Sequence, residues 1–162
     1  MLELTPEQIK ELFEYRDGDL YWKLSTNHKI AKDKKAGTKN SHGYLTITLN
    51  NKILKVHRLI FLLHYGYLPK YIDHINGNRS DNRIENLREA TASQNCLNRS
   101  VQSNNKANIK NVSWHTRDKK WQVFVTVNKQ SKYFGSFKDL ELAELVAVEA
   151  RDKFHKEYAN HG

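Results

Sequence analysis

A short polar stretch divides this 162-residue chain into two segments, and each segment must bury its own apolar side chains. Residues 100–108 are small and polar and have no apolar periodicity, which is typical of a linker. Each flanking segment is long enough for one small domain. We therefore expect a first domain over residues 1–100 with its core over 43–100, a linker over 101–108, and a second domain over 109–162.

The first segment alternates between helix and strand signals. Thr5, Pro6 and Gln8 form a capping box with proline at the first helical position, and Gly66 is a natural helix stop. The expected elements are a helix ending before Arg16, a strand over 20–22, a mobile lysine-rich loop over 23–42, a hairpin of 44–49 and 53–56, and a helix over 58–65.

The second segment has a simpler pattern. Alternating apolar residues predict three antiparallel strands, and Asp139 is a candidate N-cap for the helix that follows them. The strands are expected over 112–115, 121–127 and 133–137, and the helix carries Ala143, Ala147, Ala150 and Phe154 on one face. The whole chain therefore predicts an α+β fold.

The net charge indicates which kind of partner the protein binds, and the cysteine content indicates the kind of cellular compartment. The chain has 27 Lys and Arg against 18 Asp and Glu, a net charge of +9 that favours a polyanion such as nucleic acid. A merely solvated basic surface is the alternative. Cys96 is the single cysteine, which excludes an internal disulfide and a cysteine-rich zinc site. With no apolar run of membrane-spanning length and no signal-peptide pattern, we expect a cytoplasmic protein with no membrane partner.

The polar segment from Asp73 to Asn95 contains the groups needed for metal-assisted phosphodiester hydrolysis. The oxygens of Asp73 and Asn95 suit a single hard divalent cation, Mg²⁺ or alternatively Mn²⁺. His74 titrates near neutral pH and suits the general base, and Asn86 is expected to hold the loop and orient His74. A chance Asp-His pair beside an Asn-Gly turn is the structural alternative.

This polar segment resembles the signature of the HNH, or ββα-metal, nucleases, especially the phage and intron-encoded homing endonucleases. The resemblance implies that Asp73 and Asn95 bind the metal, that His74 is the base and that Asn86 is structural. It also implies a hairpin pairing residues 71–75 with 87–91, followed by the helix that bears Asn95. Asn95 stands where the family name has histidine, so zinc is not expected. The matching stretches are 56–59, 72–79, 81–83, 85–91 and 94–95.

Further side chains of the first domain are candidates for DNA contact. His57 either contacts a phosphate or packs at a helix start, and Arg58 either grips a phosphate or anchors a loop. The full set of candidates is His57, Arg58, Arg79, Arg83 and Arg88.

Residues 109–158 resemble an AP2 domain, in which a three-stranded antiparallel sheet packs on one helix and lies in the DNA major groove. Asn111 departs from the glycine usual at that position, so no base preference is carried over. At least one of Trp114 and Trp121 is expected to lie partly in the core. On one strand face, the polar and amphipathic residues expected to contact double-stranded DNA include Trp114, Arg117, Lys119, Gln122 and Lys132.

These features together predict a metal-dependent DNA endonuclease of the homing type, in which a histidine-activated water attacks the phosphodiester beside one divalent cation. Two different modules fit an asymmetric target read by a monomer. The resemblance to phage members implies a phage-encoded protein in a bacterial host. The alternatives are a non-catalytic DNA-binding regulator on the same scaffold, and a restriction or structure-specific nuclease.

Overall fold

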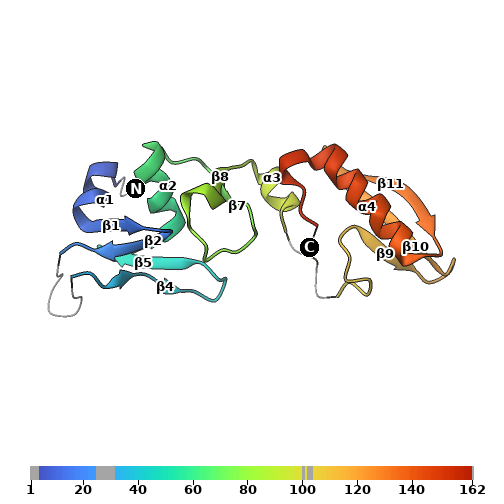
Figure 1. Cartoon of the computed structure of the whole chain (residues 1–162), viewed down its shortest axis with the longest axis horizontal. Helices are drawn as coiled ribbons and strands as arrows, with labels where there is room; N and C mark the ends of the chain where they lie inside the picture. The colour runs from blue at the N-terminus through green and yellow to red at the C-terminus, as the bar shows by residue number, and fades with distance from the viewer. Residues whose placement is uncertain (1–3, 25–31, 100, 102–103, 162) are drawn as a thin grey trace. The chain divides into compact units, whose positions relative to one another are not determined.

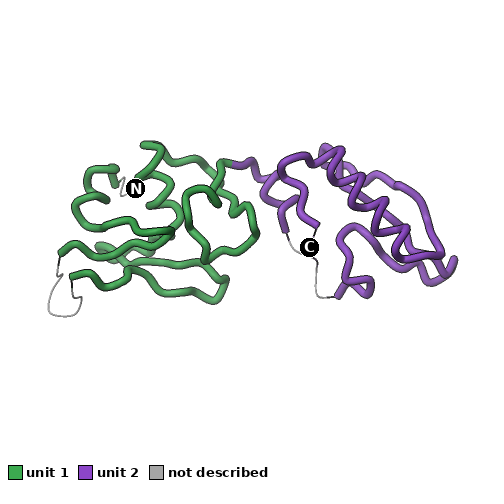
Figure 2. Tube along the Cα trace, in the orientation of Figure 1, with its two compact units in different colours: residues 1–89 green, residues 90–162 purple. Residues whose placement is uncertain are grey.

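The computed structural model describes residues 4–24, 32–99, 101 and 104–161, and it confirms the α+β class with small antiparallel sheets (Figure 1). The chain forms two compact units, residues 1–89 and 90–162 (Figure 2). The boundary thus lies before the linker expected at 101–108, of which residues 102 and 103 lie outside the described part of the chain.

The first unit opens with the expected capped helix, which is shorter than its apolar pattern indicates. Helix α1 (Pro6–Leu12) has its capping box, in which the Gln8 amide donates to Thr5 Oγ1 at 3.3 Å. Strand β1 (Phe13–Arg16) follows at once and pairs with β2 (Asp19–Trp22). Phe13 was expected on the helix, but it pairs across the ladder with Trp22 and contacts that ring at 4.6 Å between centroids.

The lysine-rich stretch from residue 23 to 42 is not a loop throughout. It contains β3 (Lys35–Ala36), which pairs with β2, and β4 (Thr38–Lys39), which pairs with β5 (Leu45–Leu49). Gly37 has a φ of +103° and lets the chain turn between the two sheets. Residues 25–31 of the expected loop lie outside the described residues.

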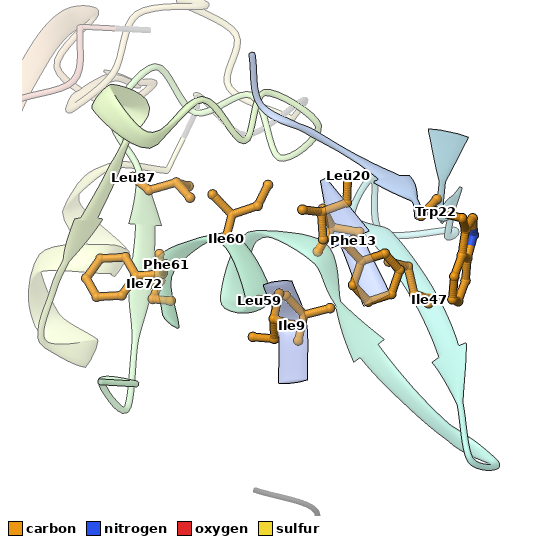
Figure 3. Packing of buried hydrophobic residues seen from close by; sticks show 12 residues of the cluster. Ile9, Phe13, Leu20, Trp22, Ile47, Leu59, Ile60, Phe61, Ile72 and Leu87 are labelled. Carbon is orange, nitrogen blue, oxygen red and sulfur yellow. The ribbon is translucent and has the colours of Figure 1, made fainter. Parts of the chain in front are cut away.

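A single apolar core joins the elements of the first unit. The expected hairpin is formed by β5 and β6 (Lys52–Lys55), and α2 (Val56–Tyr65) ends at the left-handed Gly66. Ile60 and Phe61 of α2 share this core with Ile72 of β7 (Ile72–His74) and Leu87 of β8 (Leu87–Glu89), while Leu59 lies beside Ile9 of α1 (Figure 3). The hairpin β7–β8 is therefore fixed on one side by the core.

The turn between β1 and β2 lies against the chain segment that precedes β8. Gly18 has a φ of +88°, and a Cβ atom at this position would lie 2.7 Å from the backbone nitrogen of Arg83. Nearby, the Ile84 amide donates to the Tyr15 hydroxyl at 3.2 Å, at the start of the 3₁₀ turn η2 (Ile84–Asn86). Residues distant in sequence thus support the β7–β8 connection.

The second unit contains a three-stranded sheet packed on one helix. The strands β9 (Val112–His115), β10 (Lys120–Val127) and β11 (Gln130–Phe137) are ordered β11-β10-β9, and α4 (Leu140–His155) lies along the sheet (Figure 1). Asp139 caps α4 as predicted, and small side chains on this helix allow close packing. The core residues are Val112, Val123, Val125, Val127, Ala143, Ala147 and Ala150.

Helix α3 (Ala92–Leu97) belongs to this second unit because polar contacts tie its C-terminal end to later residues. Lys110 Nζ donates to the Leu97 carbonyl at 2.6 Å, and Asn160 Nδ2 donates to the Asn98 carbonyl at 2.9 Å. The 3₁₀ turn η3 (Lys156–Tyr158) leads the chain into this contact. These bonds use carbonyl groups that a helix end leaves without an internal partner.

No helix in the described residues has the length and apolar character needed to cross a membrane.

Candidate active site

The β7–β8 hairpin places the central candidate residues next to one another in the first unit. The ladder pairs Asp73 with Arg88 and His74 with Leu87, within the region where the hairpin was expected. All three residues of β7 are buried. Consecutive side chains of a strand point to opposite faces, so Asp73 and His74 meet different surroundings.

The Asp73 carboxylate is engaged by an arginine. Asp73 is 4% exposed, and its Oδ2 accepts from Arg88 Nε at 3.0 Å and from Arg88 Nη2 at 2.9 Å. Directly paired residues share a sheet face, which explains this contact. Arg88 was predicted to contact DNA, but in this structure its guanidinium offsets the buried negative charge of Asp73.

The donor chemistry at Asp73 fits a hard divalent cation, because carboxylate oxygens are the ligands that Mg²⁺ prefers. Within the described residues, no group of three or more His, Cys, Asp or Glu side chains gathers to form a metal site by itself. A cation at Oδ2 of Asp73 competes with Arg88 for that oxygen. Asn95, the predicted second ligand, is half-buried on α3 in the other unit, so this ligand pair stays a prediction.

The His74 imidazole is held by an amide that sequence reasoning did not assign. His74 Nε2 lies 3.0 Å from Asn82 Oδ1, and both residues are buried. The amide oxygen only accepts, so Nε2 carries the proton and the lone pair of the neutral ring lies on Nδ1. Burial lowers the pKa of His74, against the opposing effects of the Asn82 hydrogen bond and of Asp73 and Asp81.

Asn86 forms side-chain hydrogen bonds within the β7–β8 connection, while Asn82 makes a side-chain hydrogen bond to His74. Asn86 Nδ2 donates to the Asp81 carbonyl at 2.7 Å and to Asn76 Oδ1 at 3.0 Å, and its Oδ1 accepts from the Asn76 amide at 3.0 Å. Its own carbonyl accepts from the Ile75 amide at 2.9 Å. Asn86 therefore acts on the segment that follows His74.

His57 packs against His74 from the first turn of α2. The two ring centroids are 5.0 Å apart with an interplanar angle of 79°, and His57 is 4% exposed. Burial lowers the pKa of His57 to about 3, with a smaller effect from His74. Of the two roles considered from sequence, the structure favours the packed histidine over a phosphate contact.

Tyr44 and Lys55, neither of which the sequence singled out, stand beside this histidine pair. The Tyr44 ring centroid is 5.3 Å from that of His57 and 6.0 Å from that of His74. Lys55 Nζ lies 4.3 Å from the Tyr44 centroid, and Arg79 Cζ lies 5.1 Å from it. Arg79 also donates to the His42 carbonyl at 3.1 Å. The grouping of Tyr44, Lys55 and Arg79 depends on strand register and loop placement, which the sequence pattern does not specify.

The remaining arginines predicted to contact DNA have partners within the first unit. Arg58 donates to the Pro69 carbonyl at 3.1 Å and so anchors the segment after α2. Arg83 binds Asp81 through Nε at 2.9 Å and Nη2 at 2.8 Å, and the Arg83 bonds lower the pKa of the Asp81 carboxyl. About half of the Arg83 side chain stays exposed, so a phosphate contact there remains a prediction.

The candidate DNA-contacting residues of the second unit do not share one face, which corrects the expectation from sequence. Trp114 pairs with Trp121, on the side of the sheet that carries the buried Val123. Lys132 pairs with the buried Val125, and its Nζ lies 5.6 Å from the Phe154 ring centroid of α4.

The opposite, open face of this sheet carries a different set of side chains. Gln122 lies there, next to Phe124 and Tyr133, whose ring centroids are 5.2 Å apart. Arg117 and Lys119 are exposed in the turn between β9 and β10.

One tryptophan belongs partly to the core, as expected. Trp121 packs against the apolar cluster of the second unit, and Trp114, 37% exposed, contacts it at 4.7 Å between ring centroids.

Comparisons with known proteins give one family match and two relatives. Residues 54–97 match a family model described as HNH endonuclease. Protein 3.8 of Escherichia phage T7 is 32% identical over 98 residues, which cover 58% of this chain and 78% of that protein. An uncharacterized HNH endonuclease of Acanthamoeba polyphaga mimivirus is 43% identical over 56 residues, 33% of this chain and 30% of that protein. No solved structure matches the chain.

Proposed function

Because the chain belongs to the HNH endonuclease family, we propose that it is a metal-dependent endonuclease that hydrolyses phosphodiester bonds in double-stranded DNA. The observation that carries this proposal is the buried His74, held by Asn82 and adjacent on β7 to the buried Asp73. A neutral imidazole with a fixed tautomer is suited to removing a proton from water. The net charge of +9 suits a polyanionic substrate.

In this proposal His74 is the general base, and it acts through Nδ1 because Nε2 donates to Asn82. The lowered pKa keeps the ring neutral at physiological pH, so it is ready to accept a proton. Asn86 keeps the segment after His74 in place through its bonds to Asn76 and Asp81. These residues supply proton transfer and positioning but no positive charge at the reacting phosphate.

Asp73 and Asn95 are proposed to hold the divalent cation, most simply Mg²⁺, with Mn²⁺ as a substitute. When bound, such a cation supplies electrostatic stabilisation of the charge that develops on the phosphate and the leaving oxygen. Asp73 provides the carboxylate, and Arg88 holds that carboxylate in position before the cation binds. The assignment of Asn95 rests on the family resemblance alone.

The second unit is proposed to be the DNA reader, as the AP2 resemblance of residues 109–158 implies. Its open sheet face presents Gln122 between aromatic and hydroxyl side chains, and Arg117 and Lys119 flank it. These groups suit contacts to base edges and phosphates. A separate reader fits a homing-type enzyme that acts as a monomer on a long asymmetric site.

The first test is cleavage of supercoiled plasmid and genomic DNA with Mg²⁺, Mn²⁺ or EDTA. We expect cation-dependent nicking by the natural chain and a loss of about 10²- to 10⁴-fold for His74→Ala, the range for a lost general base. Asp73→Asn should raise the cation concentration needed for half-maximal nicking and weaken Mn²⁺ binding in a calorimetric titration.

His64→Ala is the matched control, because His64 lies on α2 and its Nδ1 contacts the Ile60 carbonyl at 2.9 Å, apart from the His74 cluster. Equal activity of the natural chain and His74→Ala would remove His74 from the mechanism. Salt-sensitive DNA binding without any cleavage would favour the non-catalytic regulator. Cleavage at many short sites or only at branched DNA would favour a restriction or structure-specific nuclease over the homing type.

A further inference from the structure

Two cations converge on one aromatic ring beside His74. Tyr44 precedes β5, and Lys55 at the end of β6 pairs with Thr46, two residues after Tyr44 on the same sheet face. This face is opposite to the one that buries Ile47. Arg79 reaches the same ring from the β7–β8 connection. Strand register and loop placement therefore bring the two charges together from separate parts of the sequence.

The connection that carries Arg79 is fastened to the turn before Tyr44. Arg79 Nη1 donates to the His42 carbonyl at 3.1 Å, and Ser80 Oγ donates to the Gly43 carbonyl at 2.9 Å. These two bonds therefore hold the segment that carries Arg79 next to Tyr44. This arrangement is built into the fold, although both cationic side chains are exposed.

Lys55 and Arg79 differ from Arg83 and Arg88, because within the described residues neither of them has an acidic partner. Arg83 pairs with Asp81, and Arg88 pairs with Asp73. In the described part of the chain, neither Lys55 nor Arg79 lies within 4.0 Å of a carboxylate oxygen. A ring face orients a cation without cancelling its charge, so both groups keep their attraction for an anion.

We propose that Lys55 and Arg79, held on the Tyr44 ring, bind the DNA backbone phosphate that lies next to His74, and that Tyr44 is the positioning residue for both cations. This inference rests on the proposed nuclease function. The ammonium and guanidinium groups donate charge-assisted hydrogen bonds to phosphate oxygens. The Tyr44 ring, 6.0 Å from the His74 ring, sets the distance between the bound strand and the base.

The test measures DNA affinity in EDTA as a function of salt, and single-turnover nicking with the active cation. Lys55→Ala and Arg79→Ala should each reduce the slope of log affinity against log salt by about one, as expected for one lost phosphate contact. Nicking should slow by roughly 10- to 100-fold, the loss typical of a hydrogen bond to a charged group. Tyr44→Phe keeps the ring and should behave as the natural chain, whereas Tyr44→Leu should reproduce both losses.

Lys52→Ala is the matched control, since Lys52 is an exposed lysine on the same strand whose register partner, Leu49, lies on the other face. A slope and nicking rate for Lys55→Ala equal to those of Lys52→Ala would overturn the inference while leaving the nuclease proposal intact. Reduced slopes without cleavage by any variant would support the phosphate site and reject the nuclease. A natural chain that does not bind DNA would reject both. Unchanged melting temperatures of the variants confirm that folding is not the cause.

Discussion

At the scale of single residues, the imidazole rings of His57 and His74 pack edge to face in the first unit. His57 and His74 are each 4% exposed, and burial lowers the pKa of both rings. His57 Nδ1 is a buried polar atom without a hydrogen-bond partner in the described residues. A buried polar atom without a partner reduces the free energy of unfolding, and adding a proton to it would bury an uncompensated charge as well. Burial of the pair therefore favours the neutral form of both rings.

This neutrality predicts a pH-dependent stability with a defined sign. Unfolded His57 takes up a proton near its ordinary pKa of 6.5, whereas folded His57 does so only near about 3. Between these values the unfolded state binds more protons, so the free energy of unfolding falls as pH is lowered from about 6.5, by at most about 1.4 kcal/mol per pH unit. Urea unfolding at about pH 7 and about pH 5 measures the loss.

His57→Leu removes the titrating ring and serves as the comparison. Its free energy of unfolding should depend less steeply on pH in this range, whatever its absolute value. Identical pH slopes for the two proteins would show that His57 does not remain neutral in the folded state.

At the scale of elements, the β7–β8 connection is held by side chains rather than by backbone ladders. Asn86 makes three side-chain bonds within it, and Asn82 holds His74. Asn86 uses both its amide nitrogen and its amide oxygen in these bonds, and such a satisfied buried amide gives a loop one preferred conformation. His74 and the segment that follows it are thus held by asparagine side chains.

Asn86→Ala should reduce the free energy of unfolding by roughly 1–3 kcal/mol, because the Asn76 amide and the Asp81 carbonyl lose their partner. Amide hydrogen exchange should quicken at Asn76 and Ile75. Asn78→Ala, at an exposed position of the same connection, should have a smaller effect. Equal effects of the two substitutions would contradict the role assigned to Asn86.

The elements themselves were largely readable from sequence, but their contacts were not. Periodicity, caps and Gly66 predicted α2, the β5–β6 hairpin and the sheet of the second unit, whereas the β7–β8 hairpin was implied by the family resemblance. Phe13 fits either a helix or a strand, and cross-strand packing on Trp22 decides for the strand. Arg88 on Asp73 and Lys132 beside Phe154 follow from register, which a one-residue shift would reverse.

At the scale of the whole molecule, the described residues form two separate apolar cores. One includes Ile60 and Leu87, and the other includes Val125 and Ala147. The expected division into two domains therefore has a physical basis, although sequence placed α3 with the first domain. Apolar periodicity could not predict the hydrogen bonds that the Leu97 and Asn98 carbonyls accept from later residues.

Two cores predict two unfolding transitions in calorimetry. Ile60→Ala, at a position with 0% exposure, should destabilise the first unit by about 2–5 kcal/mol and lower one transition only. Val125→Ala, also 0% exposed, is the matched change in the second unit and should lower the other. A single transition that both substitutions shift equally would show that the chain unfolds as one cooperative body.

The β1–β2 turn packs against residues 82–83, and this contact sets a lower limit on the length of a fragment that could fold with the β7–β8 connection in place. The stretch that matches the family model begins at residue 54, yet its β7–β8 connection packs against Gly18 and donates a hydrogen bond to the Tyr15 hydroxyl. A fragment that contains only the matched stretch would lack the contacts with Gly18 and Tyr15. A transplantable nuclease module has to carry the first hairpin with it.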